Sequence, residues 1–330
     1  MKEILNNLIH HKPLSKETAR QVLIDLASGK YNASQMSAFM TVYMMRSITL
    51  NELRGFRDAM LELCIPVKFD EPVIDVCGTG GDGKNTFNIS TLSAFVVAAA
   101  GQPVAKHGNY GVSSLSGSSN MLEYFGYKFS NNYDVLKRSL DEANIFFMHA
   151  PLFHPAMKNV APIRKELGVK TFFNMLGPMV NPALPPNQLV GVFNLELARL
   201  YGYMYQSLNR NYIILHDLQG YDEISLTGSF KIFSNQGERI LEPSDLGLKE
   251  LSCDDIKGGN TVEESAKIFM NILKGEGTEA QNSVVAANAG MSLFTANQTS
   301  NLKSKVMLAM ETLKSGKALT SFNNLMKAQN

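Results

Sequence analysis

The sequence of 330 residues contains few cysteines, and those present lie far apart. Cys64, Cys77 and Cys253 are odd in number and do not have the spacing of metal ligands. Neither a disulfide framework nor a cysteine-based metal site is therefore expected. This usage fits a reducing compartment, and we expect a cytoplasmic protein.

An excess of charge of either sign is also missing. The 31 basic and 30 acidic side chains leave a formal net charge of +1, which creates no overall field to attract nucleic acid or an anionic membrane. We accordingly expect neither as a partner, and any anion must be bound by local groups. Hydrophobic residues make up 45% of the chain, which is typical of a globular protein that buries a full core.

Long hydrophobic runs are absent as well. The longest, near Ala94 to Ala100, is far shorter than the roughly 18 residues that a membrane span requires. The N-terminus begins with Lys2, Glu3 and an amphipathic run, and does not resemble the apolar core of a signal peptide. Both observations support the expectation of a cytoplasmic protein.

Residues 1–66 show helical patterns only. Ser15 is expected to cap a helix that closes at Gly29, and a third helix should cover about Ala33 to Met45. Thr49 and Glu52 form a capping-box pair for a fourth helix. Short helices without a strand predict a small all-helical domain.

From Val73 onward the pattern changes. A short β-rich run leads into glycines, and a helix is expected from about Ser90 to Ala100. Further apolar runs alternate with helical patterns, which indicates a mostly parallel central sheet flanked by helices. We expect strands near 73–76, 103–105, 145–148, 189–193 and 212–215, and late helices over 262–273, 280–293 and 302–313. The sequence thus predicts an α/β domain over residues 72–330.

The segment DVCGTGGDGKNTFNIST, residues 75–91, lies between a predicted strand and a predicted helix. Glycines let the backbone approach a phosphate closely, and N–H groups at a helix N-terminus bind anions. A P-loop would need Ser or Thr after Lys84, where this chain has Asn85, and the acidic residue of a dinucleotide-binding fold is missing near position 100. Asp82 would repel a pyrophosphate unless it met sugar hydroxyls or a metal. A glycine-rich surface turn is the alternative for this loop alone.

Five ordered motifs give the chain a more specific resemblance. It resembles the anthranilate phosphoribosyltransferase family in DVCGTGGDG followed by NIST, and then in KHGNYGVSS at 106–114. The match continues through HPAMKNVAPIRKELGVKTFFNMLGPMVNP at 154–182 and DEISLTG at 222–228. Nearly the whole chain is covered. The family transfers phosphoribosyl from 5-phosphoribosyl 1-pyrophosphate (PRPP) to the amine of anthranilate, in the second step of tryptophan biosynthesis from chorismate.

The resemblance carries expectations about architecture and partners. It implies a nucleoside phosphorylase/phosphoribosyltransferase-like fold, in which helices from about 164–185 join the small domain 1–66. It also implies two small-molecule substrates, PRPP and anthranilate, a Mg²⁺ cofactor with two ions per site, and a homodimer through the N-terminal helical domain. The acceptor is an aromatic amine that is neutral at pH 7, so no catalytic base is required, and the sequence identifies none.

The residues implied for the donor PRPP lie mainly in two loops. Hydroxyls at the start of the helix after the first loop would add to its free backbone N–H groups. Lys106 is a suitable phosphate partner, since a unit charge pair about 4 Å apart is worth roughly 4 kcal/mol at an effective dielectric constant of about 20. His107 has either a substrate role or that of a loop histidine bonded to backbone. The implied set is Gly78, Gly81, Asp82, Thr86, Asn88, Ile89, Ser90, Thr91, Lys106, His107, Gly108, Asn109, Ser113, Ser114 and Ser118.

The chain departs from the family directly after Asn109. The next two positions are commonly Arg and a small residue, but here they are Tyr110 and Gly111. One cation beside the donor is thereby lost. Either Tyr110 substitutes by hydrogen bonding or the affinity for the donor is lower.

The residues implied for anthranilate are Gly78, Asn109, His154 and Arg164. Arg164 corresponds to the arginine that binds the acceptor's carboxylate, for which a guanidinium fork is well suited. On spacing alone, Arg164 would instead be a surface helix arginine paired with Glu166 or another acid.

The implied magnesium ligands are Ser90, Asp222 and Glu223. Hard carboxylate oxygens are the ligands that this ion prefers. Adjacent side chains of an extended segment point opposite ways, so a turn is needed if both acids are to serve, and they could then reach two ions. The alternative is a solvated acidic turn.

Two other functions compete with the transferase. A pyrimidine nucleoside phosphorylase would cleave thymidine or uridine with phosphate and without magnesium, but the KHGN run and the pair Asp222 and Glu223 argue against it. A non-catalytic relative that binds nucleic acid should carry a basic excess and lose the acidic ligands. This chain has a net charge of +1 and keeps both acids.

Overall fold

The computed structural model describes residues 1–111 and 117–329, and it divides into two compact units. The helical unit consists of Met1–Lys68 and Ala150–Leu184, and the α/β unit of Phe69–His149 and Pro185–Asn330. The segment that completes the helical unit begins at Ala150, earlier than the start near residue 164 that the sequence suggested.

The second and fourth of the N-terminal helices begin where their predicted capping residues lie. The Ser15 side chain accepts a hydrogen bond from the N–H of Thr18 over 3.1 Å, and Thr49 and Glu52 form the expected capping box. Stacked rings of Phe56 and Phe172, with centroids 4.6 Å apart, tie the later segment of the unit to this bundle. The helices are α1 (Lys2–Ile9), α2 (Lys16–Ala27), α3 (Ala33–Met45), α4 (Leu50–Glu62), α8 (Ala150–Phe153), α9 (Ala161–Leu167) and α10 (Phe173–Leu176).

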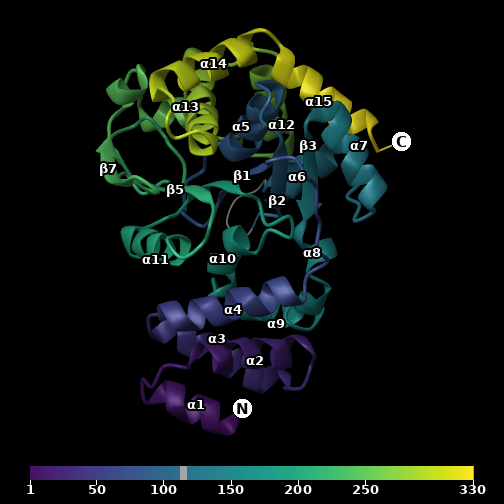
Figure 1. Ribbon diagram of the computed structural model, residues 1–330, viewed down its shortest axis with the longest axis vertical. Helices are drawn as coiled ribbons and strands as arrows, with labels where there is room; N and C mark the ends of the chain where they lie inside the picture. Colours follow the sequence, from purple (N-terminus) through teal and green to yellow (C-terminus); the bar gives the residue numbers. More distant parts are fainter. Residues whose placement is uncertain (112–116, 330) are drawn as a thin grey trace. The chain divides into compact units, whose positions relative to one another are not determined.

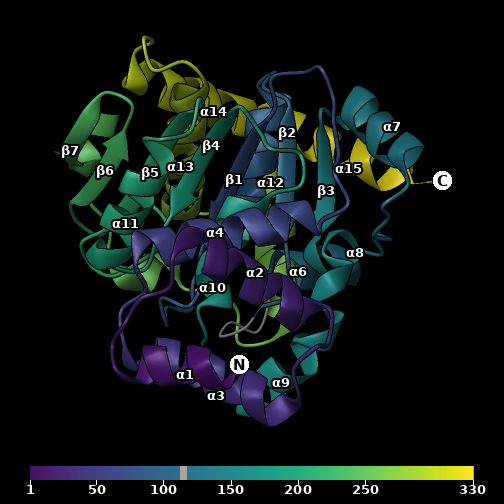
Figure 2. The same ribbon diagram turned by 60° about the horizontal axis from the view of Figure 1, so that its bottom comes forward.

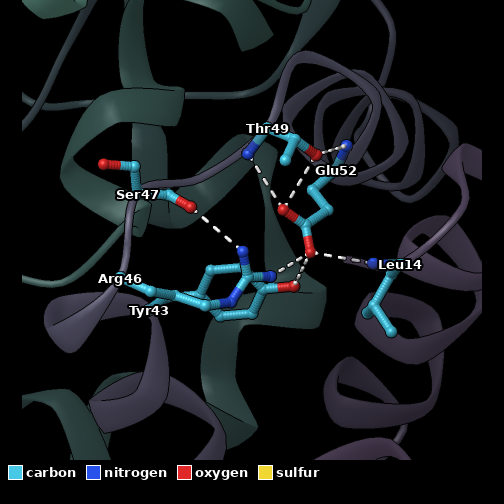
Figure 3. Close-up of polar contacts among 6 residues, drawn as sticks. All are labelled: Leu14, Tyr43, Arg46, Ser47, Thr49 and Glu52. Carbon is cyan, nitrogen blue, oxygen red and sulfur yellow. Dashed lines mark hydrogen bonds and ion pairs between the residues drawn. The ribbon is translucent and has the colours of Figure 1, made fainter. Parts of the chain in front are cut away.

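A fully buried carboxylate stabilises this bundle (Figure 3). Glu52 accepts hydrogen bonds from the N–H of Leu14 and the hydroxyl of Tyr43, and it pairs with Arg46. Burial alone would raise the pKa of Glu52, but the N–H groups of Leu14 and Thr49, and then the guanidinium, hold that pKa below its ordinary value. The charged form is therefore the one that the fold favours.

The α/β unit is built on a seven-stranded sheet with the order β3-β2-β1-β4-β5-β6-β7 (Figure 2). Its first five strands in the chain pair in parallel, which confirms the predicted mostly parallel sheet. The antiparallel hairpin of β6 and β7 at one edge was not predicted. The strands are β1 (Ile74–Gly78), β2 (Val104–Gly108), β3 (Ile145–His149), β4 (Asn187–Gly191), β5 (Asn211–Asp217), β6 (Phe230–Ser234) and β7 (Gly237–Leu241).

Helices cover both faces of this sheet (Figure 1). α5 (Ile89–Ala99) connects β1 to β2, and α11 (Leu195–Tyr205) connects β4 to β5 on the other side. The two crossovers lead away from each other in the strand order, so right-handed connections place them on opposite faces. The other helices are α6 (Ser118–Tyr124), α7 (Tyr133–Ala143), α12 (Val262–Leu273), α13 (Glu279–Ala296), α14 (Leu302–Lys314) and α15 (Lys317–Lys327).

The strand order switches direction between β1 and β4. From β1 the chain adds β2 and β3 on one side, and from β4 it adds β5, β6 and β7 on the other. β1 and β4 are neighbours over their full length, from the pair Ile74 and Asn187 to the pair Gly78 and Gly191. In open α/β sheets, ligands bind beyond the carboxyl ends of the strands at such a switch point. Across the described part of the chain, no helix combines the length and apolar character needed to cross a membrane.

Candidate functional site

The glycine-rich loop leaves the carboxyl end of β1, where it meets the acidic turn that follows β5. The Oδ2 atom of Asp222 accepts a hydrogen bond from the N–H of Gly80 over 2.6 Å. The Oε1 atom of Glu223 accepts one from the N–H of Ser90, in the first turn of α5, over 2.8 Å. The structure thus brings together the three residues predicted to hold magnesium. A solvated acidic turn is wrong, because Asp222 is buried.

Gly78, the last residue of β1, allows this approach. A Cβ atom at that position would lie only 2.4 Å from the Oδ2 atom of Asp222. Every other residue type would therefore push the carboxylate away from the loop. Gly78 was predicted to line the donor, and the geometry also gives it a part in seating an acidic side chain.

The two acids carry more negative charge than their surroundings compensate. Burial, and next the Asp82 carboxylate, raise the pKa of Asp222 to about 7. Desolvation and the adjacent Asp222 raise the pKa of Glu223 well above its ordinary value. A bound cation would oppose both shifts, since it favours the ionised carboxylates.

Lys106 lies in the interior of the sheet. Its Nζ atom donates a hydrogen bond to the carbonyl oxygen of Val76 over 2.7 Å, and its side chain is buried. Burial lowers the pKa of Lys106, while the charges of Asp75, Cys77 and Glu223 oppose that shift. In the free protein the ammonium group is therefore held by β1, and its charge acts on Glu223.

His107 occupies β2 and not a loop, so the loop-histidine alternative is wrong about its position. The residue is buried, and its backbone N–H donates to Oδ1 of Asp75 over 3.3 Å. Asp75 is itself fully buried and also accepts from the side chain of Gln188 over 3.3 Å.

The second loop begins at the end of β2. The carbonyl oxygen of Asn109 accepts from the N–H of Ser119 over 3.2 Å and from the hydroxyl of Ser118 over 3.4 Å. A Cβ on Gly108 would lie 2.4 Å from both the Phe147 ring and the Ser118 hydroxyl oxygen. These contacts fix the start of α6 beside the loop. Two predicted donor residues, Ser113 and Ser114, lie outside the described residues.

Tyr110, at the departure from the family pattern, packs against the end of β3. Its hydroxyl donates to Glu123 over 3.3 Å, and its ring meets that of His149 edge to face with centroids 4.8 Å apart. In the free protein the hydroxyl is thus bonded to an acid of α6.

The remaining donor residues predicted in the first loop surround the start of α5. Ile89 and Thr91 are buried in the first turn of α5. The Oδ1 atom of Asp82 accepts from the N–H of Lys84 over 3.0 Å, which closes the loop on itself. Gly81 lies within that loop, Asn88 is the N-cap of α5, and Thr86 forms a bridge with Lys257.

Arg164 and His154 belong to the helical unit. Arg164, in α9, donates to Oδ1 of Asn174 over 3.3 Å and lies 5.2 Å from the ring centroid of Phe173. Burial lowers the pKa of Arg164, and no ion pair joins it to an acidic side chain within the described ranges, so the predicted alternative of pairing with Glu166 is wrong.

His154 is buried as well. Burial lowers its pKa to about 4, although the backbone of Val180 and Met60 partly opposes the shift. The ring is therefore neutral at pH 7, and it offers shape and hydrogen bonding instead of charge.

Magnesium fits this set of oxygen ligands. Within residues 1–111 and 117–329, no three His, Cys, Asp or Glu side chains converge so as to hold a metal ion alone. Magnesium commonly binds through one or two carboxylates, several waters and the phosphates of a substrate. Asp222, Glu223 and Ser90, the residues predicted as ligands, offer oxygen atoms of this kind.

Comparisons with known proteins agree with this geometry. The family model described as "Glycosyl transferase family, a/b domain" matches residues 70–319, and "Glycosyl transferase family, helical bundle domain" matches residues 2–64. A relative from Flavobacterium psychrophilum named anthranilate phosphoribosyltransferase is 61% identical over 326 residues, or 98% of each chain. One of the same name from Christiangramia forsetii is 61% identical over 328 residues, or 99% of each.

The chain belongs to the anthranilate phosphoribosyltransferase family. Among solved structures, the anthranilate phosphoribosyltransferase of Thermus thermophilus has a TM-score of 0.91 at 34% identity and covers 99% of both chains. The Saccharomyces cerevisiae enzyme in complex with PRPP and Mg has a TM-score of 0.90 at 26% identity, with 98% of this chain and 96% of that chain covered. This family membership removes the support for a phosphorylase or a nucleic-acid-binding relative.

Two residues that support the site were not predicted from the sequence, because they lie far along the chain from its loops. Gly191 ends an apolar strand, and a glycine in that place is a signal of close backbone approach. Asn288 lies among small apolar residues of a buried helix, where an isolated amide signals an internal hydrogen-bond network. Neither signal identifies its partner.

Proposed function

We propose that this protein transfers the phosphoribosyl group of PRPP to the amino group of anthranilate. The products are N-(5-phosphoribosyl)anthranilate and pyrophosphate, and the reaction is the second step of tryptophan biosynthesis from chorismate. The C–O bond to pyrophosphate breaks, the C–N bond to the amine forms, and the amine releases one proton. The junction of the glycine loop with Asp222 and Glu223, at the carboxyl ends of β1 and β4, is the observation that carries this proposal.

The donor is bound in the α/β unit. The N–H groups of Gly80 and Ser90 supply anion-binding donors at the loop and at the start of α5. Without a ligand these two N–H groups are bonded to Asp222 and Glu223. If PRPP took the place of the two carboxylates, Asp222 and Glu223 would be free to hold magnesium. The other residues proposed to bind PRPP are Gly78, Gly81, Asp82, Thr86, Asn88, Ile89, Thr91, Lys106, His107, Gly108, Asn109, Ser113, Ser114 and Ser118.

Two magnesium ions per site are proposed, held by Ser90, Asp222 and Glu223. When bound, the metal would shield the donor's negative charge and stabilise pyrophosphate as it leaves. Lys106 adds a positive charge behind Glu223 from the interior of the sheet. The rate then depends on orientation and charge stabilisation at an oxocarbenium-like transition state, and no catalytic base is assigned.

The acceptor's carboxylate is bound by Arg164 of the helical unit. Its side chain is half-buried, lies over the Phe173 ring and donates to the amide oxygen of Asn174, and its other N–H donors suit a carboxylate. Gly78, Asn109 and His154 complete the proposed acceptor set. A cytoplasmic location and a homodimer through the N-terminal helices belong to the same proposal.

The test follows the fluorescence of anthranilate, which the transfer of phosphoribosyl from PRPP to its amino group should abolish. We expect loss of the signal with PRPP and Mg²⁺ together, and a stable signal when either is omitted or chelated. Thymidine and uridine with phosphate serve as the control for phosphorolysis. A metal-independent cleavage of either nucleoside, with no consumption of anthranilate, would overturn the proposed function.

A further inference from the structure

One buried amide of α13 is directed at the acidic turn. The Oδ1 atom of Asn288 accepts a hydrogen bond from the N–H of Ile224 over 3.0 Å. Its Nδ2 atom donates to the carbonyl oxygen of Ile224 over 2.9 Å and to that of Val284, one helical turn earlier, over 2.9 Å. Asn288 therefore holds both backbone polar groups of the residue that directly follows Glu223.

A second buried side chain, that of Asp217 at the end of β5, also holds this turn. The Oδ2 atom of Asp217 accepts from the N–H of Ser225 over 3.1 Å and from its hydroxyl over 2.6 Å. The Oδ1 atom accepts from the N–H of Gln219 over 2.8 Å. The turn that carries Asp222 and Glu223 is thus bonded on both sides of the two acids.

The backbone of this turn needs such support. Leu226 has a φ of +62°, a left-handed conformation that a residue with a bulky side chain rarely adopts. Conformations of this kind persist where the surrounding structure determines them, and they cluster at functional sites. Without the bonds from Asn288 and Asp217, the turn could relax and move the two carboxylates.

We propose that Asn288 is a positioning residue for magnesium binding. It fixes the Ile224 peptide and thereby the direction in which the neighbouring Glu223 and Asp222 side chains leave the backbone. An amide buried in an apolar helix is costly unless its bonds are made. Among the residues that the structure describes, the Asn288 side chain makes its hydrogen bonds outside α13 to Ile224. This inference rests on the proposed function, since it concerns the acids assigned to the metal.

The test compares Asn288→Ala with a matched control on the same helix, Asn282→Ala. Asn282 is also buried, and its side chain donates to the carbonyl oxygen of Gly277 over 2.9 Å, away from the acidic turn. PRPP binding is titrated by calorimetry at a series of Mg²⁺ concentrations, and turnover is measured over the same series. Thermal unfolding is followed for both variants.

In Asn288→Ala we expect the Mg²⁺ concentration for half-maximal PRPP binding to rise about 10-fold or more, as for other supports of metal ligands. Excess Mg²⁺ should restore most of the turnover, and the Michaelis constant for anthranilate should change little. Asn282→Ala should lower the melting temperature but leave the Mg²⁺ midpoint unchanged. Equal Mg²⁺ midpoints in wild type and Asn288→Ala would overturn the inference and leave Asn288 a purely structural residue.

Two further variants separate the possible failures. Asn288→Ser keeps a short hydroxyl and should give an intermediate Mg²⁺ midpoint, so it decides the matter should the alanine variant not fold. The double variant Asp222→Asn with Glu223→Gln should lose Mg²⁺-dependent PRPP binding. If it binds PRPP as wild type does, the metal assignment of the proposed function fails. If only the Asn288 variants behave as wild type, the inference alone fails.

Discussion

A Cβ atom placed on Gly191 would lie 1.5 Å from the carbonyl oxygen of Asp222. The end of β4 and the acidic turn are therefore in closer contact than any side chain permits. The carbonyl oxygen of Gly191 also accepts a hydrogen bond from the N–H of Thr79, at the start of the glycine loop, over 2.9 Å. One glycine thus links β4 to both parts of the proposed donor site.

Gly191→Ala should displace the acidic turn. The added methyl group meets backbone, which cannot rotate away as a side chain can, so we expect a loss of about 3 kcal/mol or more in the free energy of unfolding. Gly202→Ala in α11 is the control, since its Cβ would make an ordinary contact at 3.5 Å with Phe233. Urea unfolding should show the control to be neutral or stabilised. A Gly191→Ala variant as stable as wild type would contradict the clash.

The double variant Asp222→Asn with Glu223→Gln should be nearly inactive at saturating Mg²⁺. The amides preserve shape but remove the two negative charges that oxygen-ligated magnesium prefers. The measurement is the initial rate of anthranilate fluorescence loss over a range of Mg²⁺. Asp254→Asn, an exposed acid paired with Lys257, is a control that should keep full activity. Near-normal turnover of the double variant would remove the metal assignment.

Arg164→Ala should raise the Michaelis constant for anthranilate far more than that for PRPP. A hydrogen bond to a charged group is worth about 1.5–3 kcal/mol, which corresponds to a change of roughly 10- to 100-fold. Steady-state kinetics with each substrate varied in turn measures both constants. Lys165→Ala, at the next position of the same helix, provides the control. An equal effect on both substrates would argue against a role in binding the carboxylate.

Glu52→Gln should destabilise the protein at neutral pH. It leaves Arg46, whose side chain is only 8% exposed, without its acidic partner, and breaking a buried pair costs about 3–5 kcal/mol. The pKa of Glu52 is lowered by folding, so its stabilising contribution is present above the ordinary carboxyl pKa and is lost as the pH falls through the lowered value. The difference in melting temperature between wild type and variant should therefore shrink in acid.

A surface ion pair gives the matched control for that prediction. Glu62 pairs with Arg20, and the two side chains are 46% and 39% exposed. Such pairs contribute about 0–1 kcal/mol. Glu62→Gln should leave the melting temperature almost unchanged at pH 7, and a loss equal to that of Glu52→Gln would contradict the importance of burial.

Local signals in the sequence were sufficient for the helical bundle and for most of the sheet. Ser15 and the pair Thr49 and Glu52 act within one turn of their own helix, so their neighbours in sequence are their partners in space. The hairpin of β6 and β7 was missed. Its outer strand is a polar run, GERIL, that is largely exposed at the sheet edge and shows little of the buried apolar pattern of the other strands.

The sequence by itself determined the family, the order of the motifs and the residue types that can bind a phosphorylated sugar, magnesium and a carboxylate. Only the tertiary structure decided which side chains are buried and what they contact. Lys106 is held by the Val76 carbonyl, Asp222 is seated between Gly78 and Gly191, and Asn288 reaches Ile224 from a helix 64 positions away. Such contacts arise where strands and helices distant in the chain meet, and burial there determines hydrogen-bond partners and pKa values that no local pattern contains.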